Sequence, residues 1–147
     1  MSSLSQRIRS VALPIVAIAV LAAACSKSGA QTGGSPTPQA RPSSTGIIRI
    51  LSPKNGQVFH GASVDITVKV ALTGAKIVPA TTTHIVPDQG HLHVYLDNQI
   101  VTMNFSLTGD VPNVGPGLHV LKVEFVASDH QPFDPRVIEQ VAIEVKA

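Results

Sequence analysis

Residues 64–70 read Val-Asp-Ile-Thr-Val-Lys-Val, and this short stretch decides the fold class. Every second residue from Val64 to Val70 is β-branched and apolar, and each residue between them is polar. Successive side chains of a β-strand point to opposite faces, so a period of two predicts a strand with one buried face. An amphipathic α-helix would instead place apolar residues three and four positions apart.

The same alternation recurs between Gly46 and Ala147. It is found in residues 91–97, 121–125 and 140–146, and a further strand is predicted over residues 47–51. Glycines and prolines fall between these stretches, where turns are needed, and no stretch has the period of an amphipathic helix. About seven short strands in a segment of this length predict an all-β fold, a single immunoglobulin-like β-sandwich over residues 46–147.

The register of one strand pair is also predicted. Leu96-Asp97-Asn98-Gln99-Ile100 has the composition of a tight hairpin turn. With a two-residue turn, opposite residues have opposite parity, so the apolar residues of the two strands share a face. These residues are Leu92, Val94 and Leu96 on one strand, and Val101, Met103 and Phe105 on the other. Met103 is therefore expected in the core, and His91 and His93 on the other face.

The N-terminal residues 1–24 are predicted to be a signal peptide. Two arginines come first, and the uncharged run Val11–Ala24 follows. The run is shorter than the roughly 20 apolar residues of a membrane-spanning helix, but it has the length of a signal-peptide core. It ends in Leu21-Ala22-Ala23-Ala24-Cys25, which resembles the lipobox of bacterial lipoproteins. The resemblance implies that Cys25 starts the mature chain and is lipidated; the alternative is ordinary signal cleavage beside an unrelated cysteine.

Residues 25–45 are predicted to be the lipidated cysteine and a flexible tether. After Cys25 the segment consists of Ser, Thr, Gly, Pro, Gln and Ala, apart from Lys27 and Arg41. Such a composition cannot bury a core. Acyl chains on Cys25 would anchor the protein to a membrane, and the tether would hold the domain away from the lipid. The predicted location is the extracytoplasmic side of a cell membrane.

Three segments of the domain resemble bacterial secreted proteins. Ser52–Val58 is similar to the first-strand turn of bacterial immunoglobulin-like domains. Pro116–Leu121 is similar to the segment that enters their penultimate strand, with His119 at a place where tyrosine is frequent and bonds the backbone. Gly90–Asp97 reads Gly-His-Leu-His-Val-Tyr-Leu-Asp and, with Asp-His-Gln-Pro downstream, resembles uncharacterised secreted proteins that have a Gly-His-x-His strand. These resemblances imply the fold and export, and a structural role for His119, but no activity.

The six histidines all lie in this domain, and four of them are candidate metal ligands. His91 and His93 are two positions apart on a strand, so their side chains leave one face about 6.5–7 Å apart. Neutral imidazole binds copper and zinc. The loop before this strand and the loop between the last two strands lie at one end of a sandwich, which brings further ligands near. The candidate ligands are His91, His130, His84, His93 and Asp129. The structural alternative is that these side chains only hydrogen-bond their neighbours.

The composition argues against several other functions. A single cysteine rules out an intrachain disulfide and a cysteine-based zinc site. Without the two arginines of the leader, basic and acidic residues are equal in number, which does not indicate nucleic-acid binding. No nucleophile elbow or zinc-protease helix motif is present, so no enzyme is predicted. The sequence favours a non-catalytic binding or structural module with an unknown partner; the alternative is a copper- or zinc-binding protein of the cell envelope.

Overall fold

A computed structural model describes residues 40–79 and 81–147. The predicted signal peptide, Cys25 and most of the predicted tether lie outside these residues. The described residues contain nine β-strands: β1 (Ile47–Ser52), β2 (Gln57–His60), β3 (Val64–Thr73), β4 (Lys76–Ile77), β5 (Gln89–Leu96), β6 (Gln99–Asn104), β7 (Thr108–Val114), β8 (Gly117–Ala127) and β9 (Pro132–Lys146). They include no helix that is long and apolar enough to cross a membrane.

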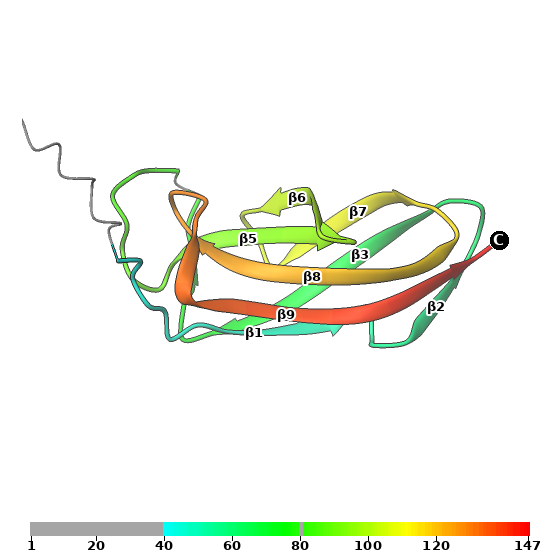
Figure 1. The fold of residues 1–147 in the computed structure, drawn as a ribbon, viewed down its shortest axis with the longest axis horizontal. Helices are drawn as coiled ribbons and strands as arrows, with labels where there is room; N and C mark the ends of the chain where they lie inside the picture. The colour runs from blue at the N-terminus through cyan, green and yellow to red at the C-terminus, as the bar shows by residue number, and fades with distance from the viewer. Residues whose placement is uncertain (1–39, 80) are drawn as a thin grey trace, which may run out of the picture. The chain divides into compact units, whose positions relative to one another are not determined.

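The strands form two sheets that pack against each other (Figure 1). The smaller sheet has the order β1-β3-β7, and its pairs are antiparallel. The larger sheet has the order β2-β9-β8-β5-β4, and β6 also pairs with β5. The predicted all-β sandwich is confirmed, with nine strands in the described residues where about seven were expected. The short strands β2 and β4, of four and two residues, account for the difference.

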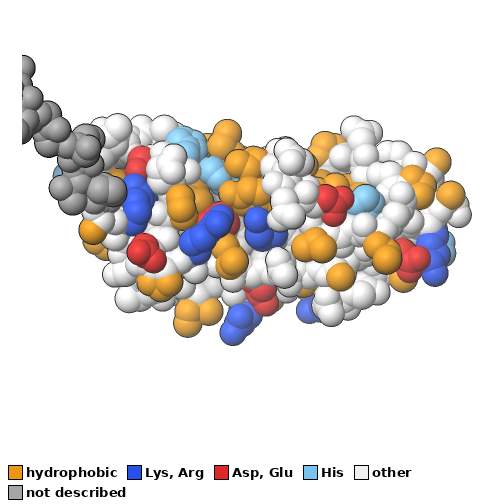
Figure 2. Space-filling model, viewed as in Figure 1, with side chains coloured by type: hydrophobic (Ala, Val, Ile, Leu, Met, Phe, Trp, Pro, Cys, Tyr) orange, Lys and Arg blue, Asp and Glu red, His pale blue; other side chains and the backbone are white. Residues whose placement is uncertain are grey.

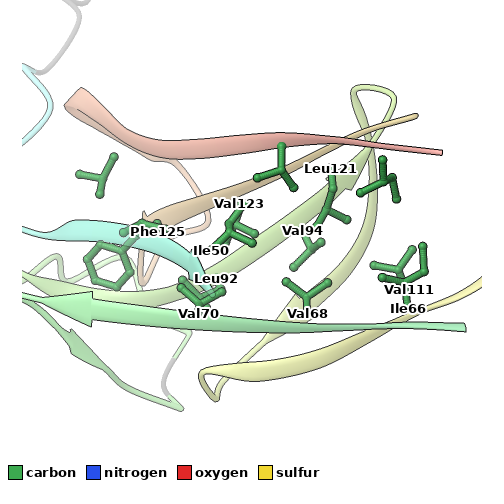
Figure 3. Packing of buried hydrophobic residues seen from close by; sticks show 14 of the residues in the cluster. Ile50, Ile66, Val68, Val70, Leu92, Val94, Val111, Leu121, Val123 and Phe125 are labelled. Carbon is green, nitrogen blue, oxygen red and sulfur yellow. The ribbon is translucent and has the colours of Figure 1, made fainter. Parts of the chain in front are cut away.

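The hydrophobic core lies between the two sheets (Figure 3). Ile66, Val68 and Val70 of β3 are buried in it, as the period-two pattern predicts. Opposite them lie residues of β5, β8 and β9, among them Phe125, whose ring stacks on that of Phe133 at 5.3 Å. Each such side chain contributes about 1.5–3 kcal/mol when it is fully buried. Among the described residues, the buried hydrophobic residues of this core all lie between Ile48 and Val145.

The register of β5 and β6 differs from the predicted one. The turn is tight, with Leu96 opposite Gln99, but Val101 of β6 has no paired residue on β5. This β-bulge reverses the parity of every later pair, so His93 lies opposite Met103. Opposite residues share a face, and Met103 is 51% exposed on the histidine face of the sheet. The prediction that Met103 is a core residue was therefore wrong.

The end of the predicted tether contacts the domain. The Pro42 carbonyl accepts a hydrogen bond from the Asp134 backbone N–H at 3.0 Å. The Ser44 hydroxyl and the Thr45 backbone N–H both donate to the Asp88 carboxylate, at 2.7 and 2.6 Å. Residues 42–45 are therefore held on the domain surface. They precede residue 46, where the domain was predicted to begin.

Candidate metal centre

The two histidines that β5 contributes to the candidate site follow Gly90, a glycine that the packing requires. A Cβ atom at Gly90 would collide with the carbonyl oxygen of Val126 on β8. Only glycine therefore lets the start of β5 lie this close to β8. His91 and His93 follow at alternate positions of β5, and Leu92 between them points into the core. Both imidazoles consequently leave the outer face of the larger sheet together.

The third histidine comes from the loop between β8 and β9. The His130 backbone N–H donates to the Ala127 carbonyl at 2.9 Å, and the Ala127 N–H donates to the Gln131 carbonyl at 3.0 Å. His130 has a φ of 64°, in the left-handed region, where histidine is more frequent than most residues. This tight turn brings the His130 ring to 4.4 Å from the His91 ring, measured between centroids. Figure 2 shows histidine atoms beside hydrophobic ones at this end of β5.

The nitrogen atoms of the three rings converge on one point. His91 Nε2 is 3.2 Å from His93 Nε2 and 2.9 Å from His130 Nδ1, and the latter two are 3.4 Å apart. Three nitrogens bound to one tetrahedral zinc ion, at about 2.0–2.1 Å each, lie about 3.3–3.4 Å from one another. The observed triangle thus needs shifts of only tenths of an ångström to hold a metal ion.

At most two of the three nitrogen pairs in this triangle can be hydrogen bonds. Each ring nitrogen of a neutral imidazole either carries a proton or presents a lone pair. Two of any three such atoms must therefore be alike, and two like atoms repel each other at these distances. A cation at the centre removes the conflict, because all three nitrogens can then present lone pairs to it. We call His91, His93 and His130 the histidine triangle.

Burial keeps two rings of the triangle, those of His91 and His93, uncharged. His91 is 0% and His93 4% exposed. Burial, together with the charges of His130 and His93, lowers the pKa of His91 to about 4. Burial and the charge of His130 also lower the pKa of His93, although the nearby Glu124 carboxylate opposes the shift. Both rings are therefore neutral at neutral pH, the state that metal coordination requires.

One buried atom of the triangle is not satisfied. His91 Nδ1 has no hydrogen-bond partner among residues 40–79 and 81–147. Such a buried polar atom costs about 1–3 kcal/mol of folding free energy in either tautomer. The face of the ring is covered by Phe105, at 4.9 Å between centroids. Polar groups that reduce stability in this way are typical of functional sites.

The carboxylate nearest to His93 in the sheet is already paired. Glu124 of β8 lies opposite His93 and is 1% exposed. Arg136 donates to both of its oxygens, at 2.7 and 2.6 Å, and the Tyr95 hydroxyl donates at 3.0 Å. Burial alone would raise the pKa of Glu124, but these hydrogen bonds and the charges of Arg136 and Lys122 hold it below its ordinary value. Glu124 is thus an ionised partner of Arg136 next to the triangle.

Two of the predicted ligands lie elsewhere. His84 is exposed, and its backbone N–H donates to the Thr82 hydroxyl. Asp129 receives two hydrogen bonds from the guanidinium of Arg41, at 2.6 and 2.9 Å. These bonds lower the pKa of Asp129, since they outweigh its partial burial. The structure therefore brings together His91, His93 and His130 but neither His84 nor Asp129, because Arg41 of the predicted tether occupies the carboxylate.

Comparison with known proteins supports the fold. No protein-family model matches this chain, and no curated protein matches it either. A fibronectin(III)-like module of Clostridium thermocellum CbhA superposes with a TM-score of 0.51 and 18% identity, over 68% of this chain and 96% of the module. The PKD domain of human KIAA0319 gives a TM-score of 0.43 and 13% identity, over 78% of this chain and 92% of that domain. The chain has an immunoglobulin-like β-sandwich fold, and at such identities the likeness concerns the fold alone.

His119 has a structural role, as the sequence suggested. Its Nδ1 lies 2.7 Å from an Asp97 carboxylate oxygen, and its Nε2 lies 2.9 Å from the Gly115 carbonyl oxygen. Both partners are acceptors, so the ring binds them best when both nitrogens carry protons. The hydrogen bond to Asp97 raises the pKa of His119; partial burial opposes this shift, and the Gly115 carbonyl adds to it.

This arrangement predicts a pH-dependent loss of stability in His119→Ala. We expect the free energy of unfolding to fall by about 1–3 kcal/mol at pH 6. The folded-state pKa is raised, so the stabilisation is complete below the unfolded pKa of about 6.5 and is lost as the pH rises through the folded value. Urea unfolding of both proteins at pH 6 and pH 9 measures the difference. A difference that is the same at both pH values would contradict the charged hydrogen-bond pair.

Proposed function

We propose that this protein is a non-catalytic metal-binding protein that holds one transition-metal ion, copper or zinc, in the histidine triangle. The observation that carries the proposal is the convergence of three ring nitrogens within 2.9–3.4 Å, two of them on buried and neutral rings. Imidazole is a ligand of both metals. Of the functions that the sequence left open, a module for an unknown partner has no comparable observation in its favour.

The incomplete hydrogen bonding of the metal-free triangle supports the proposal. A purely structural cluster would satisfy its buried polar atoms, whereas this one leaves His91 Nδ1 without a described partner, and at most two of its three nitrogen pairs can be hydrogen bonds. Apolar residues would fill the same space at lower cost. A bound cation converts the repulsion into three favourable bonds, so the arrangement is better explained by a ligand than by folding.

The leader supplies the cellular setting of the proposed function. The signal-like run Val11–Ala24 and the following Cys25 support export and lipid attachment. Acyl chains on Cys25 would hold the domain at the extracytoplasmic face of a membrane, with the intervening residues as a tether. The protein would then bind metal outside the cytoplasm, where histidine ligands remain available without the need for reduced cysteines.

Metal titration tests the proposal. The chain from Ser26 to Ala147 keeps the whole core and all three histidines, and it is titrated with Zn(II) and Co(II) by calorimetry and absorption. We expect one ion per chain and, for Co(II), the visible bands of a tetrahedral site. At a free Zn(II) concentration of about 100 times Kd, the free energy of unfolding should rise by about 2.7 kcal/mol. Absence of saturable binding of Zn(II), Co(II) and also Cu(I), with an unchanged melting temperature, would refute the proposed function.

A further inference from the structure

A methionine that the predicted register had placed in the core lies beside the histidine triangle. Met103 of β6 is directly opposite His93 of β5. Opposite residues of an antiparallel pair share a face, and their Cβ atoms lie about 4.5–5.5 Å apart. The Met103 side chain is unbranched and half exposed, so it can rotate without displacing packed neighbours. Its thioether sulfur, two bonds beyond Cβ, belongs to a side chain on the same face of the sheet as the His93 ring.

The described surroundings of the triangle supply no free negative charge. Asp129 is paired with Arg41, and Glu124 is paired with Arg136. The available ligands are three imidazoles and a thioether, none of which supplies a negative charge, and the Phe105 ring packs against the His91 ring. The cost of burying an ion rises steeply with its charge. A monovalent ion is therefore favoured here over a divalent one.

We infer that the site binds Cu(I), with His91, His93 and His130 as nitrogen ligands and Met103 as the sulfur ligand. The inference rests on the proposed function, which it makes specific for one metal ion. Thioether sulfur is a soft ligand that selects Cu(I), whereas imidazole alone suits copper and zinc alike. The four side chains come from β5, β6 and the β8–β9 loop, and a tetrahedral ion has a place for each of them.

Met103→Leu tests this inference, since leucine keeps the apolar bulk but has no sulfur. Cu(I) affinity of the chain from Ser26 to Ala147 is measured without oxygen, by competition with a chromogenic Cu(I) chelator. Zn(II) affinity of the same variant is the internal control. We expect Cu(I) binding to weaken by about tenfold or more, and Zn(II) binding to change by less than about threefold.

A second measurement detects the sulfur directly. Met103 is the only methionine between Ser26 and Ala147, so selenomethionine labelling marks this one position after removal of a fusion partner. X-ray absorption at the copper and selenium edges should show a Cu–Se distance. Leu107→Ala, which removes another exposed apolar side chain that follows β6, should leave Cu(I) affinity unchanged.

The outcomes separate this inference from the proposed function. If Met103→Leu binds Cu(I) as tightly as the wild type and no Cu–Se distance is seen, Met103 is not a ligand, and metal binding by the triangle still stands. An equal loss of Cu(I) and Zn(II) affinity would overturn the copper preference. If the wild-type chain binds neither metal, the proposed function fails, and the inference fails with it.

Discussion

His91→Leu should abolish metal binding by the domain and leave the metal-free protein at least as stable as the wild type. The distance from His91 Nε2 to His130 Nδ1, 2.9 Å, is the shortest in the triangle. Without His91 only two of the three nitrogen ligands remain, and two ligands hold an ion far less tightly than three. We expect the affinity for Zn(II) to fall by more than about a hundredfold, since even changes behind a ligand cost 10–100-fold. Leucine removes a fully buried polar ring whose Nδ1 has no partner among the described residues, and its apolar burial offsets the loss of the Nε2 contacts with His93 and His130.

Calorimetric titration and thermal unfolding of the same sample measure both effects. His119→Ala is the matched control, because its ring is bonded to Asp97 and Gly115 and should affect stability without affecting metal binding. If His91→Leu kept the wild-type affinity, the triangle would not be the metal site. If it instead lost several kcal/mol of stability without a change in affinity, His91 would be a structural residue.

Cys25→Ser should release the protein from the membrane. Each buried methylene of an acyl chain contributes about 0.8 kcal/mol to membrane binding, and two or more chains give stable anchoring. Serine has no thiol to form the thioether, so nearly all of the protein is expected in the soluble fraction or as an unprocessed precursor. Fractionation of expressing cells, with mass spectrometry of the mature N-terminus, measures this.

The control for this experiment is Ser26→Ala, which changes the neighbouring residue and keeps the thiol. It should fractionate with the membrane like the wild type. Membrane fractionation of Cys25→Ser at the wild-type level, with normal processing, would contradict the proposed lipid anchor. Because metal binding uses other residues, this result would leave the histidine triangle as proposed.

Local patterns were sufficient for the fold class. The alternation in residues 64–70 became β3, with Ile66, Val68 and Val70 in the core. Such a pattern is readable because side-chain direction in a strand depends only on position, not on the partner. For the same reason His91 and His93 were expected on one face, and both rings leave the same face of β5. Their burial was not expected, because it depends on Phe105 and on the loop that carries His130.

Pairwise geometry was not predictable from local patterns. The place of Met103 depends on the bulge at Val101, and a single unpaired residue inverts every later pair. Asp129 was expected near the metal, but Arg41, distant in the chain, takes both of its oxygens. His84 was expected there too, and its loop leaves it exposed. A strand bulge decided the first outcome, a partner distant in the chain the second, and the loop conformation the third.

The sequence by itself determined that the chain folds as an all-β sandwich and that His91 and His93 leave one face of a strand. Both follow from the period of the side chains along a strand, which is a local property. Only the tertiary structure decided that His130 completes the triangle, that Met103 lies beside it, and that Asp129 is taken by Arg41. A metal site requires several atoms to meet within a few ångströms, and that convergence depends on loop conformation and strand register together.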